Sequence, residues 1–288
     1  MPDRRRSGPL GGQGATRSEQ PWGRFLIGVF DSGVGGLSVL RALRAELPRE
    51  DFVYLADSGF APYGERGDDY VIGRTRIVVE RLLQDHQVKA LVIACNTATA
   101  AAIHLIRAEY PRLPLVGVEP ALKPAAALSK TRRIGVIGTR GTLGSAKVRT
   151  LHDSLKDQAE FVLVPCDGLA DAIQNDDAAQ IAQLCARYMQ ALGPFGSEEG
   201  QIDTLVLGCT HYPFAQHHLA PHVGEGVHMI ETGEPVARQT RRQLEAADLL
   251  KAGGDGSIAL LTTGSQQALE AAARRWLHLD NAASSLHF

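Results

Sequence analysis

The chain lacks an excess of charge of either sign, because its 288 residues include 30 lysines and arginines against 32 aspartates and glutamates. A nearly balanced charge creates no overall field that would hold a nucleic acid or an anionic membrane surface. Long apolar runs are also missing: stretches such as Leu91 to Cys95 fall far short of the roughly 20 residues that span a bilayer. We therefore expect neither nucleic acid nor membrane as a partner, and favour a small or locally recognised ligand.

Cysteine is scarce as well, and its spacing excludes two common uses. No pair of cysteines has the CxxC spacing of a redox motif, and the histidines from His211 to His222 do not combine with them into a zinc pattern. We therefore expect no bound metal. The four cysteines are Cys95, Cys166, Cys185 and Cys209.

The first 24 residues are rich in glycine, arginine and serine and contain no continuous apolar region. This composition is typical of a disordered leader and not of a secretory signal peptide. Without an export signal, a disulfide framework is not expected, and the cytoplasm, where thiols stay reduced, is the expected compartment.

What the sequence does contain is a series of short apolar runs that alternate with longer amphipathic segments such as Tyr70 to Asp85 and Ala178 to Leu192. Continuous rather than alternating apolar runs are typical of strands in parallel sheets that are buried on both faces. The pattern therefore predicts open α/β layers, and the length suggests two domains. The nine predicted strands are Phe25 to Phe30, Phe52 to Ala56, Ala90 to Cys95, Leu115 to Val118, Arg133 to Ile137, Phe161 to Val164, Thr204 to Leu207, Val227 to Ile230 and Ile258 to Leu261.

A weak internal repeat relates the two halves of the chain. Gly28 to Gly36 resembles Gly135 to Thr142, since in each an apolar run enters a turn of small residues. Leu91 to Thr97 likewise resembles Leu205 to His211, and each places a cysteine at the end of an apolar strand. We therefore predict two similar, mainly parallel α/β domains related by a pseudo-twofold duplication.

The first predicted domain comprises residues 25–118 and 230–288, and the second comprises residues 119–229. In open α/β sheets a ligand binds outside the carboxyl ends of the strands, where Cys95 and Cys209 both lie. This places the predicted active site in the cleft between the domains.

The two strand-end cysteines carry the chemical argument. A thiol at a helix N-terminus is expected to have a lowered pKa, because exposed backbone N–H groups favour the thiolate. Two thiols that face one cleft suit a reaction with a base on one side of a carbon and an acid on the other, such as inversion of an α-carbon. Cys166 is ambiguous by the same test, and Cys185, inside a helical stretch, is expected to pack in the core.

Polar residues near the two cysteines admit both functional and structural interpretations. The turn Asp31 to Gly36 fits either presentation of backbone amides to a carboxylate or simple close packing of glycine. Asn96, Thr97, Thr99 and Thr210 suit carboxylate binding and helix capping equally. His211 could tune Cys209, and Tyr63 could cap a ligand.

Four stretches of the chain match one known family: they are Phe30 to Val39, Ala61 to Gly64, Ala94 to Thr99 and Leu207 to Pro213. Together they resemble the glutamate racemases, the cofactor-independent amino-acid racemases of bacterial cell-wall synthesis. The similarity runs in order from Ile27 to Thr263. It implies interconversion of L- and D-glutamate by a two-base mechanism without pyridoxal phosphate or metal, a supply of D-glutamate for peptidoglycan, and a homodimer.

By the same resemblance, Cys95 takes the α-proton from D-glutamate and Cys209 takes it from L-glutamate. Asp31 and His211 assist Cys95 and Cys209 respectively. The residues implied to hold the substrate are Asp31, Ser32, Tyr63, Gly64, Asn96, Thr97, Thr210 and His211, with Thr142 as a further candidate.

The chain departs from the family after Cys166, where many members have Cys-Pro and then a helix that bears an assisting glutamate. Here that glutamate is not clearly present; Asp171 is the candidate replacement, and Gln174 lies further along. Three other functions stay open: a related racemase that acts on aspartate, an amino-acid-binding module without chemistry, and a dithiol redox protein, which the missing CxxC disfavours.

Overall fold

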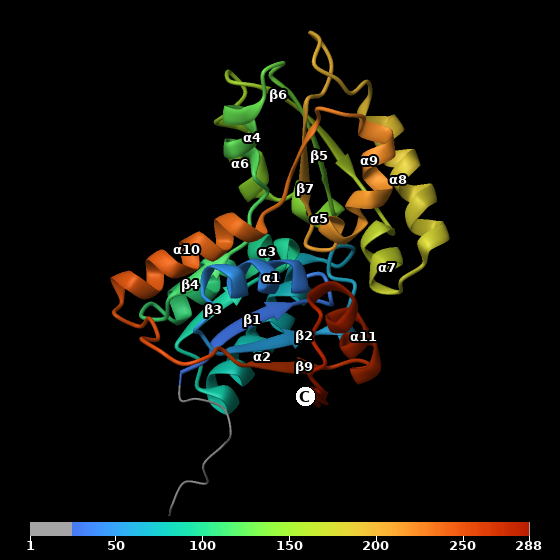
Figure 1. Ribbon diagram of the computed structural model, residues 1–288. Helices are drawn as coiled ribbons and strands as arrows, with labels where there is room; N and C mark the ends of the chain where they lie inside the picture. Colours follow the sequence, from blue (N-terminus) through green and yellow to red (C-terminus); the bar gives the residue numbers. More distant parts are fainter. Residues whose placement is uncertain (1–24, 288) are drawn as a thin grey trace, which may run out of the picture.

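Two separate parallel sheets organise residues 25–287, the part of the chain that this computed structural model describes (Figure 1). The predicted leader, residues 1–24, lies outside the described residues. The six-stranded sheet has the order β10-β9-β2-β1-β3-β4, and the four-stranded sheet has the order β6-β5-β7-β8. The strands of the first are β1 Ile27–Asp31, β2 Phe52–Ala56, β3 Ala90–Ile93, β4 Leu115–Gly117, β9 Ile258–Thr262 and β10 Ala283–Ser285. Those of the second are β5 Arg133–Gly138, β6 Glu160–Pro165, β7 Thr204–Gly208 and β8 His228–Ile230.

Helices cover both faces of each sheet, and we call each sheet with its helices a lobe (Figure 1). In the first lobe α1, α10 and α11 cover one face, and α2 and α3 cover the other. These helices are α1 Leu37–Glu46, α2 Asp68–His86, α3 Asn96–Glu109, α10 Gly233–Ala246 and α11 Gln266–Leu277. In the second lobe α7, α8 and α9 lie opposite α4 and α6. The second-lobe helices are α4 Leu122–Leu128, α5 Arg140–Leu143, α6 Ala146–Asp153, α7 Leu169–Gln174, α8 Ala178–Leu192 and α9 Gln216–Val223.

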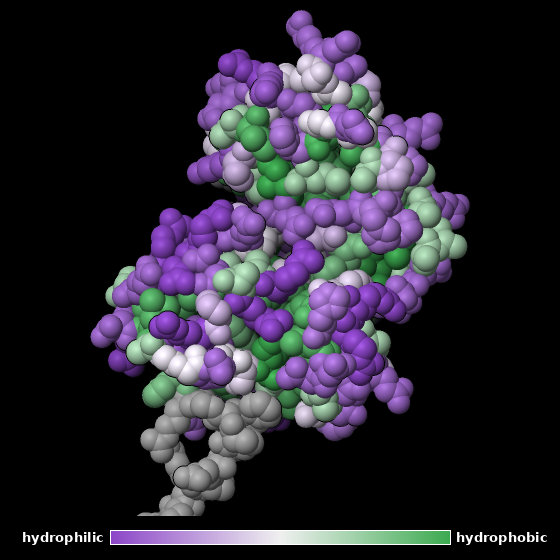
Figure 2. All heavy atoms as spheres, viewed as in Figure 1, coloured by the Kyte–Doolittle hydropathy of each residue, from purple (hydrophilic) through white to green (hydrophobic). Residues whose placement is uncertain are grey.

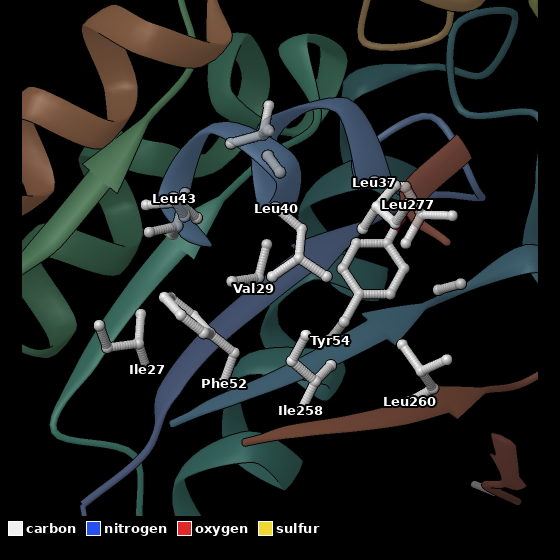
Figure 3. Packing of buried hydrophobic residues seen from close by; sticks show 14 of the residues in the cluster. Ile27, Val29, Leu37, Leu40, Leu43, Phe52, Tyr54, Ile258, Leu260 and Leu277 are labelled. Atoms are coloured by element: carbon white, nitrogen blue, oxygen red, sulfur yellow. The ribbon is translucent and has the colours of Figure 1, made fainter. Parts of the chain in front are cut away.

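The continuous apolar runs form strands because side chains on both faces of the sheet are buried. In β1, Ile27 and Val29 pack against α1, whereas Phe30 packs on the α2 side. Figure 3 shows the first of these cores, where Leu40 of α1 lies over Val29 and beside Tyr54 of β2. Each such buried aliphatic side chain stabilises the fold by roughly 1.5–3 kcal/mol.

The surface is correspondingly polar. In Figure 2 hydrophilic residues cover most of the visible face of both lobes, and hydrophobic residues show mainly in the recesses. Over the described residues, no helix combines the length and the apolar character needed to cross a membrane.

Strand order and register confirm the predicted duplication. The order β2-β1-β3-β4 in the first sheet matches β6-β5-β7-β8 in the second. Ile27 of β1 pairs with Ala90 of β3, and Ile134 of β5 pairs in the same way with Thr204 of β7. Counting on from the paired residues, Cys95 and Cys209 occupy equivalent places at the carboxyl ends of β3 and β7. The predicted fold class is therefore confirmed, while the domain boundaries at 118/119 and 229/230 stay a prediction.

The two lobes meet at the carboxyl ends of their strands. The backbone N–H of Gly141 donates to the carbonyl oxygen of Gly64 across the boundary at 3.2 Å. The Ser38 hydroxyl donates to the carbonyl oxygen of Thr210 at 2.8 Å. Because these bonds join residues that follow β1, β2, β5 and β7, they bring the two strand-end regions face to face.

Candidate active site

A cavity lies between the lobes at these facing strand ends, and both Cys95 and Cys209 line it. Of the predicted site residues, Asp31 lies behind the cavity wall rather than in it. The other predicted residues in the wall are Ser32, Tyr63, Gly64, Asn96, Thr97, Thr210 and His211. The structure thus brings the predicted residues together around one space, while their individual roles stay predictions.

Cys95 occupies the N-cap position of α3, directly after β3. Its Sγ accepts a hydrogen bond from the Ala98 backbone N–H at 3.4 Å and donates to the Ser32 hydroxyl at 3.5 Å. Burial, and after it the charge of Asp31, raises the pKa of the Cys95 thiol to about 12, although the Ala98 N–H opposes the rise. The predicted lowering of this pKa is therefore wrong, because desolvation outweighs the helix N-terminus.

Cys209 follows β7, and its Sγ lies 3.7 Å from Nδ1 of His211. Burial also raises the pKa of the Cys209 thiol, against the lowering effect of the His211 backbone N–H. Burial lowers the pKa of His211 to about 4, so its imidazole is neutral near pH 7. Both thiols are therefore protonated at rest, and each needs a neighbouring base before it can accept a proton from a substrate.

Asp31 is the neighbouring group on the Cys95 side. This last residue of β1 is fully buried, and its Oδ2 accepts hydrogen bonds from the Gly36 N–H at 2.6 Å and the Thr210 hydroxyl at 3.4 Å. Within the described residues Oδ1 has no hydrogen-bond partner. Burial raises the pKa of Asp31 from 3.8 to about 7, although the Gly36 N–H and the Cys95 thiol lower it. Such a carboxyl group can take up and release a proton near neutral pH.

The raised pKa of Asp31 predicts a pH-dependent stability. Between its ordinary pKa of 3.8 and about 7, the folded chain holds a proton on this carboxyl that the unfolded chain has released. The stability that Asp31 contributes is thus fully present at low pH and is lost as pH rises through 7. Asp31→Asn cannot titrate and so lacks this loss. The free energy of unfolding of the variant, relative to that of the wild type, should therefore increase by on the order of 3 kcal/mol from pH 4 to pH 7. Urea unfolding measured across this range checks the difference, and a difference that does not change with pH would contradict the expectation.

The glycines after Asp31 make room for side chains of the other lobe. A Cβ added to Gly33 would lie 2.3 Å from Oε1 of Gln174, and one added to Gly35 would lie 2.3 Å from Nδ1 of His211. Neither glycine has a positive φ, so space and not backbone conformation requires them. Of the two interpretations of this turn, close packing therefore applies at these positions, and the packed partners are site residues.

Tyr63 is held in place by a buried network that the sequence did not reveal. Its hydroxyl donates to Asp57 at 2.6 Å, and Arg74 of α2 donates to both Asp57 oxygens at 3.0 and 2.8 Å. The Thr263 hydroxyl donates to Asp57 as well. Because the Tyr63 hydroxyl is engaged by Asp57, it is not turned toward a ligand, and the network fixes the Pro62–Gly64 loop in the cavity wall. The one signal in the sequence was the position of Asp57 directly after β2.

Uncharged polar groups form much of the wall. Asn96 is buried, and neither of its side-chain amide atoms has a partner in the described structure, so a ligand can satisfy both. The Thr97 hydroxyl lies 3.1 Å from that of Thr139 and 3.3 Å from that of Thr142, across the boundary between the lobes. Thr139, which no sequence pattern singled out, lines the cavity; Thr142 is fully buried behind it.

Thr99 has a structural role. Its hydroxyl donates to the Ile93 carbonyl oxygen and accepts the Val118 N–H, both at 3.1 Å. Since both partners are backbone groups, Thr99 fixes the start of α3 and leaves ligand binding to its neighbours.

Helix α7 carries both Asp171, the candidate replacement for the assisting glutamate, and Gln174. Asp171 lines the cavity, but Gln174, at the end of α7, is the residue that reaches His211, with Oε1 3.0 Å from Nε2. Gly168 is the N-cap of α7, and its φ of 78° lies in the left-handed region that favours glycine. This start sets the direction of α7 and thereby places Gln174 beside His211.

The charged groups at the cavity are largely paired or peripheral. Arg140 forms an ion pair with Asp167, and both side chains are exposed. Carboxylates in the cavity would therefore be held mainly by neutral donors. Among residues 25–287, no group of three or more histidine, cysteine, aspartate or glutamate side chains is arranged to hold a metal ion.

Comparison with known proteins adds a family. The sequence matches the family model of Asp/Glu/hydantoin racemases over residues 27–240. A glutamate racemase of Methylococcus capsulatus is 49% identical over 237 residues, which are 82% of this chain and 83% of the relative.

Solved structures show the same fold. A glutamate racemase isoform of Bacillus anthracis has a TM-score of 0.80 and 32% identity, and the match covers 92% of this chain and 98% of that chain. The glutamate racemase of Escherichia coli, solved with L-glutamate and an activator, has a TM-score of 0.78 and 26% identity over 92% of this chain and 97% of its own.

Proposed function

The chain belongs to the Asp/Glu/hydantoin racemase family, and from this membership we infer that it interconverts L- and D-glutamate. The observation that carries the inference is the pair of thiols, Cys95 and Cys209, at equivalent ends of β3 and β7 and in the wall of one cavity. Glutamate is the substrate named for the similar enzymes, and one of them has been solved with L-glutamate bound.

The proposed mechanism uses each thiol on one face of the α-carbon. In the L-to-D direction His211 accepts the proton of Cys209, and the thiolate then removes the α-proton of L-glutamate. Cys95 donates its proton to the opposite face, and its thiolate recovers a proton from Asp31. In the reverse direction Cys95 is the base, with Asp31 as the acceptor of its proton. Each step moves one proton between neighbouring groups.

The surroundings of the thiols support this assignment of roles. Since both thiols are protonated in the free protein, each can donate a proton without first receiving one. When a thiol acts as the base, the acceptor beside it can remove the thiol proton. The acceptor is Asp31, with a pKa of about 7, for Cys95, and neutral His211 for Cys209. The proposal also includes a supply of D-glutamate for peptidoglycan, a cytoplasmic location and, as the resemblance implies, a homodimer.

The first experiment follows the optical rotation of L-glutamate in deuterated buffer with purified protein and no added cofactor. Loss of rotation together with α-deuterium incorporation supports the proposal. Faster turnover of L-aspartate would identify the related aspartate racemase instead. Binding of glutamate without exchange would favour a binding module, and reduction of a test disulfide without racemisation would favour a redox protein.

Gly35→Ala is expected to reduce kcat/KM for glutamate about 100-fold. The new Cβ would overlap the His211 ring, so the imidazole must leave its place beside Cys209. Gly67→Ala, at a glycine with nothing within 4 Å of the added Cβ, is the control that should keep wild-type activity. A Gly35 variant with wild-type kcat/KM would show that the observed position of His211 is unimportant for turnover.

A further inference from the structure

Gln174 joins the two lobes at the side of the imidazole that faces away from Cys209. Its side chain extends from the end of α7, which lies at the boundary between the lobes (Figure 1). The oxygen Oε1 accepts the backbone N–H of Val34 in the first lobe at 2.8 Å. The same oxygen lies 3.0 Å from Nε2 of His211 in the second lobe.

The Val34 contact fixes the orientation of the amide. A backbone N–H can only donate, so the atom that faces it at 2.8 Å must be the oxygen of Gln174 and not its NH₂ group. If the amide were flipped, the NH₂ group of Gln174 would face the N–H of Val34, and neither of these two partly buried donors would have an acceptor. The oxygen can only accept, so the Nε2 atom of His211 must carry a hydrogen to bond with it. The Val34 N–H thus determines, through the amide oxygen, that Nε2 of His211 carries a hydrogen.

Building on the proposed function, we propose that Gln174 is a positioning residue that holds His211 in the Nε2–H tautomer, so that the lone pair of Nδ1 faces the Cys209 thiol. The Nδ1 atom lies 3.7 Å from Sγ and is the acceptor for the thiol proton. In the opposite tautomer a hydrogen on Nδ1 would meet the S–H group, and Cys209 would have no acceptor for its proton. Gln174 would thus decide whether the thiolate of Cys209 can form.

The amide of Gln174 is neutral and adds no charge beside the imidazole of His211. Asp31 is bonded to Thr210, the residue before His211, and Tyr212 follows it in the chain. Gly33 and Gly35, which face the imidazole ring, carry no charge. The other titratable groups of the cavity wall around His211 are Tyr63, Glu65, Cys95, Arg140, Cys166, Asp167, Asp171 and Cys209. Burial alone accounts for the low pKa of His211. With a carboxylate at position 174, an ion pair would raise that pKa, so the imidazole would be protonated over a wider pH range.

The two catalytic sides therefore differ in their chemistry although the strands are duplicated. L- and D-glutamate are enantiomers of equal free energy, so kcat/KM must be equal in both directions for the wild type and for every variant. A defect confined to the Cys209 side cannot appear as a difference between these two values. The test must therefore observe the imidazole itself.

The direct measurement is ¹⁵N NMR of histidine-labelled, full-length protein, with the His211 signals identified by their absence from His211→Gln. We expect a protonated Nε2 and an unprotonated Nδ1 near pH 7. A protonated Nδ1, alone or with Nε2, would overturn the proposal. The spectrum needs no substrate, so this tautomer without any racemisation would overturn the proposed function and support the role of Gln174.

Three variants separate positioning from simple support of the fold. Gln174→Leu should lose the single tautomer and reduce kcat/KM about tenfold, the rate equivalent of one hydrogen bond. Gln174→Glu should keep the Nε2–H bond but shift the pH midpoint of the His211 titration upward from about 4. Gln180→Leu makes the same replacement at an exposed glutamine of α8 and should change neither. An unchanged tautomer and kcat/KM in Gln174→Leu, relative to Gln180→Leu, would overturn the proposal.

Discussion

Cys95→Ala and Cys209→Ala should each reduce racemisation of glutamate by roughly 10²- to 10⁴-fold, the usual contribution of a general acid or base. Each variant keeps one thiol and one neighbouring proton acceptor, but it lacks the group on the opposite face of the α-carbon. The remaining thiol can still remove the α-proton and return one from solvent to the same face. Each variant should therefore still exchange the α-proton of glutamate with solvent, although it racemises glutamate poorly.

The exchange should also select one enantiomer in each variant. Cys95→Ala retains Cys209 and should incorporate deuterium into L-glutamate, whereas Cys209→Ala should incorporate it into D-glutamate. Proton NMR in deuterated buffer measures both rates. Cys185→Ala is the matched control, because Cys185 is buried in α8 and does not line the cavity, and it should racemise like the wild type. Exchange of both enantiomers by a single-thiol variant would contradict the assignment of the two faces.

Arg74→Met should destabilise the fold by roughly 3–5 kcal/mol, the typical effect of removing one partner from a buried ion pair. Asp57 is fully buried, and its carboxylate would lose both hydrogen bonds from the guanidinium. The free energy of urea unfolding measures the change. Activity should fall as well, because Tyr63 and its loop are bonded to the same carboxylate.

Two companion variants make this prediction specific. Arg76→Met, two residues further along α2, breaks the exposed pair with Glu109 and should cost less than about 1 kcal/mol. Adding Asp57→Asn to Arg74→Met removes the uncompensated charge and should restore much of the lost stability. If the two single arginine variants were equally stable, the buried pair would not have the importance that we assign to it.

The sequence was sufficient for most of the sheet structure because buried parallel strands are continuously apolar. Strand β10, Ala283–Ser285, was missed since it is short and contains mostly small polar residues. The pairing β9-β2 was equally out of reach: it joins Phe52 to Ile258, which are far apart in sequence, and no local pattern records such a contact.

The same holds for the candidate site: residues marked by a local sequence pattern could be found, and residues placed by contacts between distant parts of the chain could not. Cys95 and Cys209 could be found because each ends an apolar strand within a repeated motif. Gln174 could not be assigned, because its relation to His211 depends on the start of α7 and on the approach of Val34 from the other lobe. The pKa values of the thiols were predicted in the wrong direction because helix position can be read from sequence, whereas the extent of burial cannot.

Cys95 and Cys209 belong to different lobes, and this has a consequence for successive turnovers. On the proposed mechanism, each L-to-D conversion leaves the second lobe one proton richer and the first lobe one proton poorer. The protein that releases D-glutamate is therefore in the protonation form that accepts D-glutamate, and it must exchange protons with solvent before it can accept L-glutamate again. The free enzyme thus keeps the protonation state that its last product left. At high substrate concentration the exchange of these protons with solvent, rather than proton transfer at the α-carbon, would set the rate.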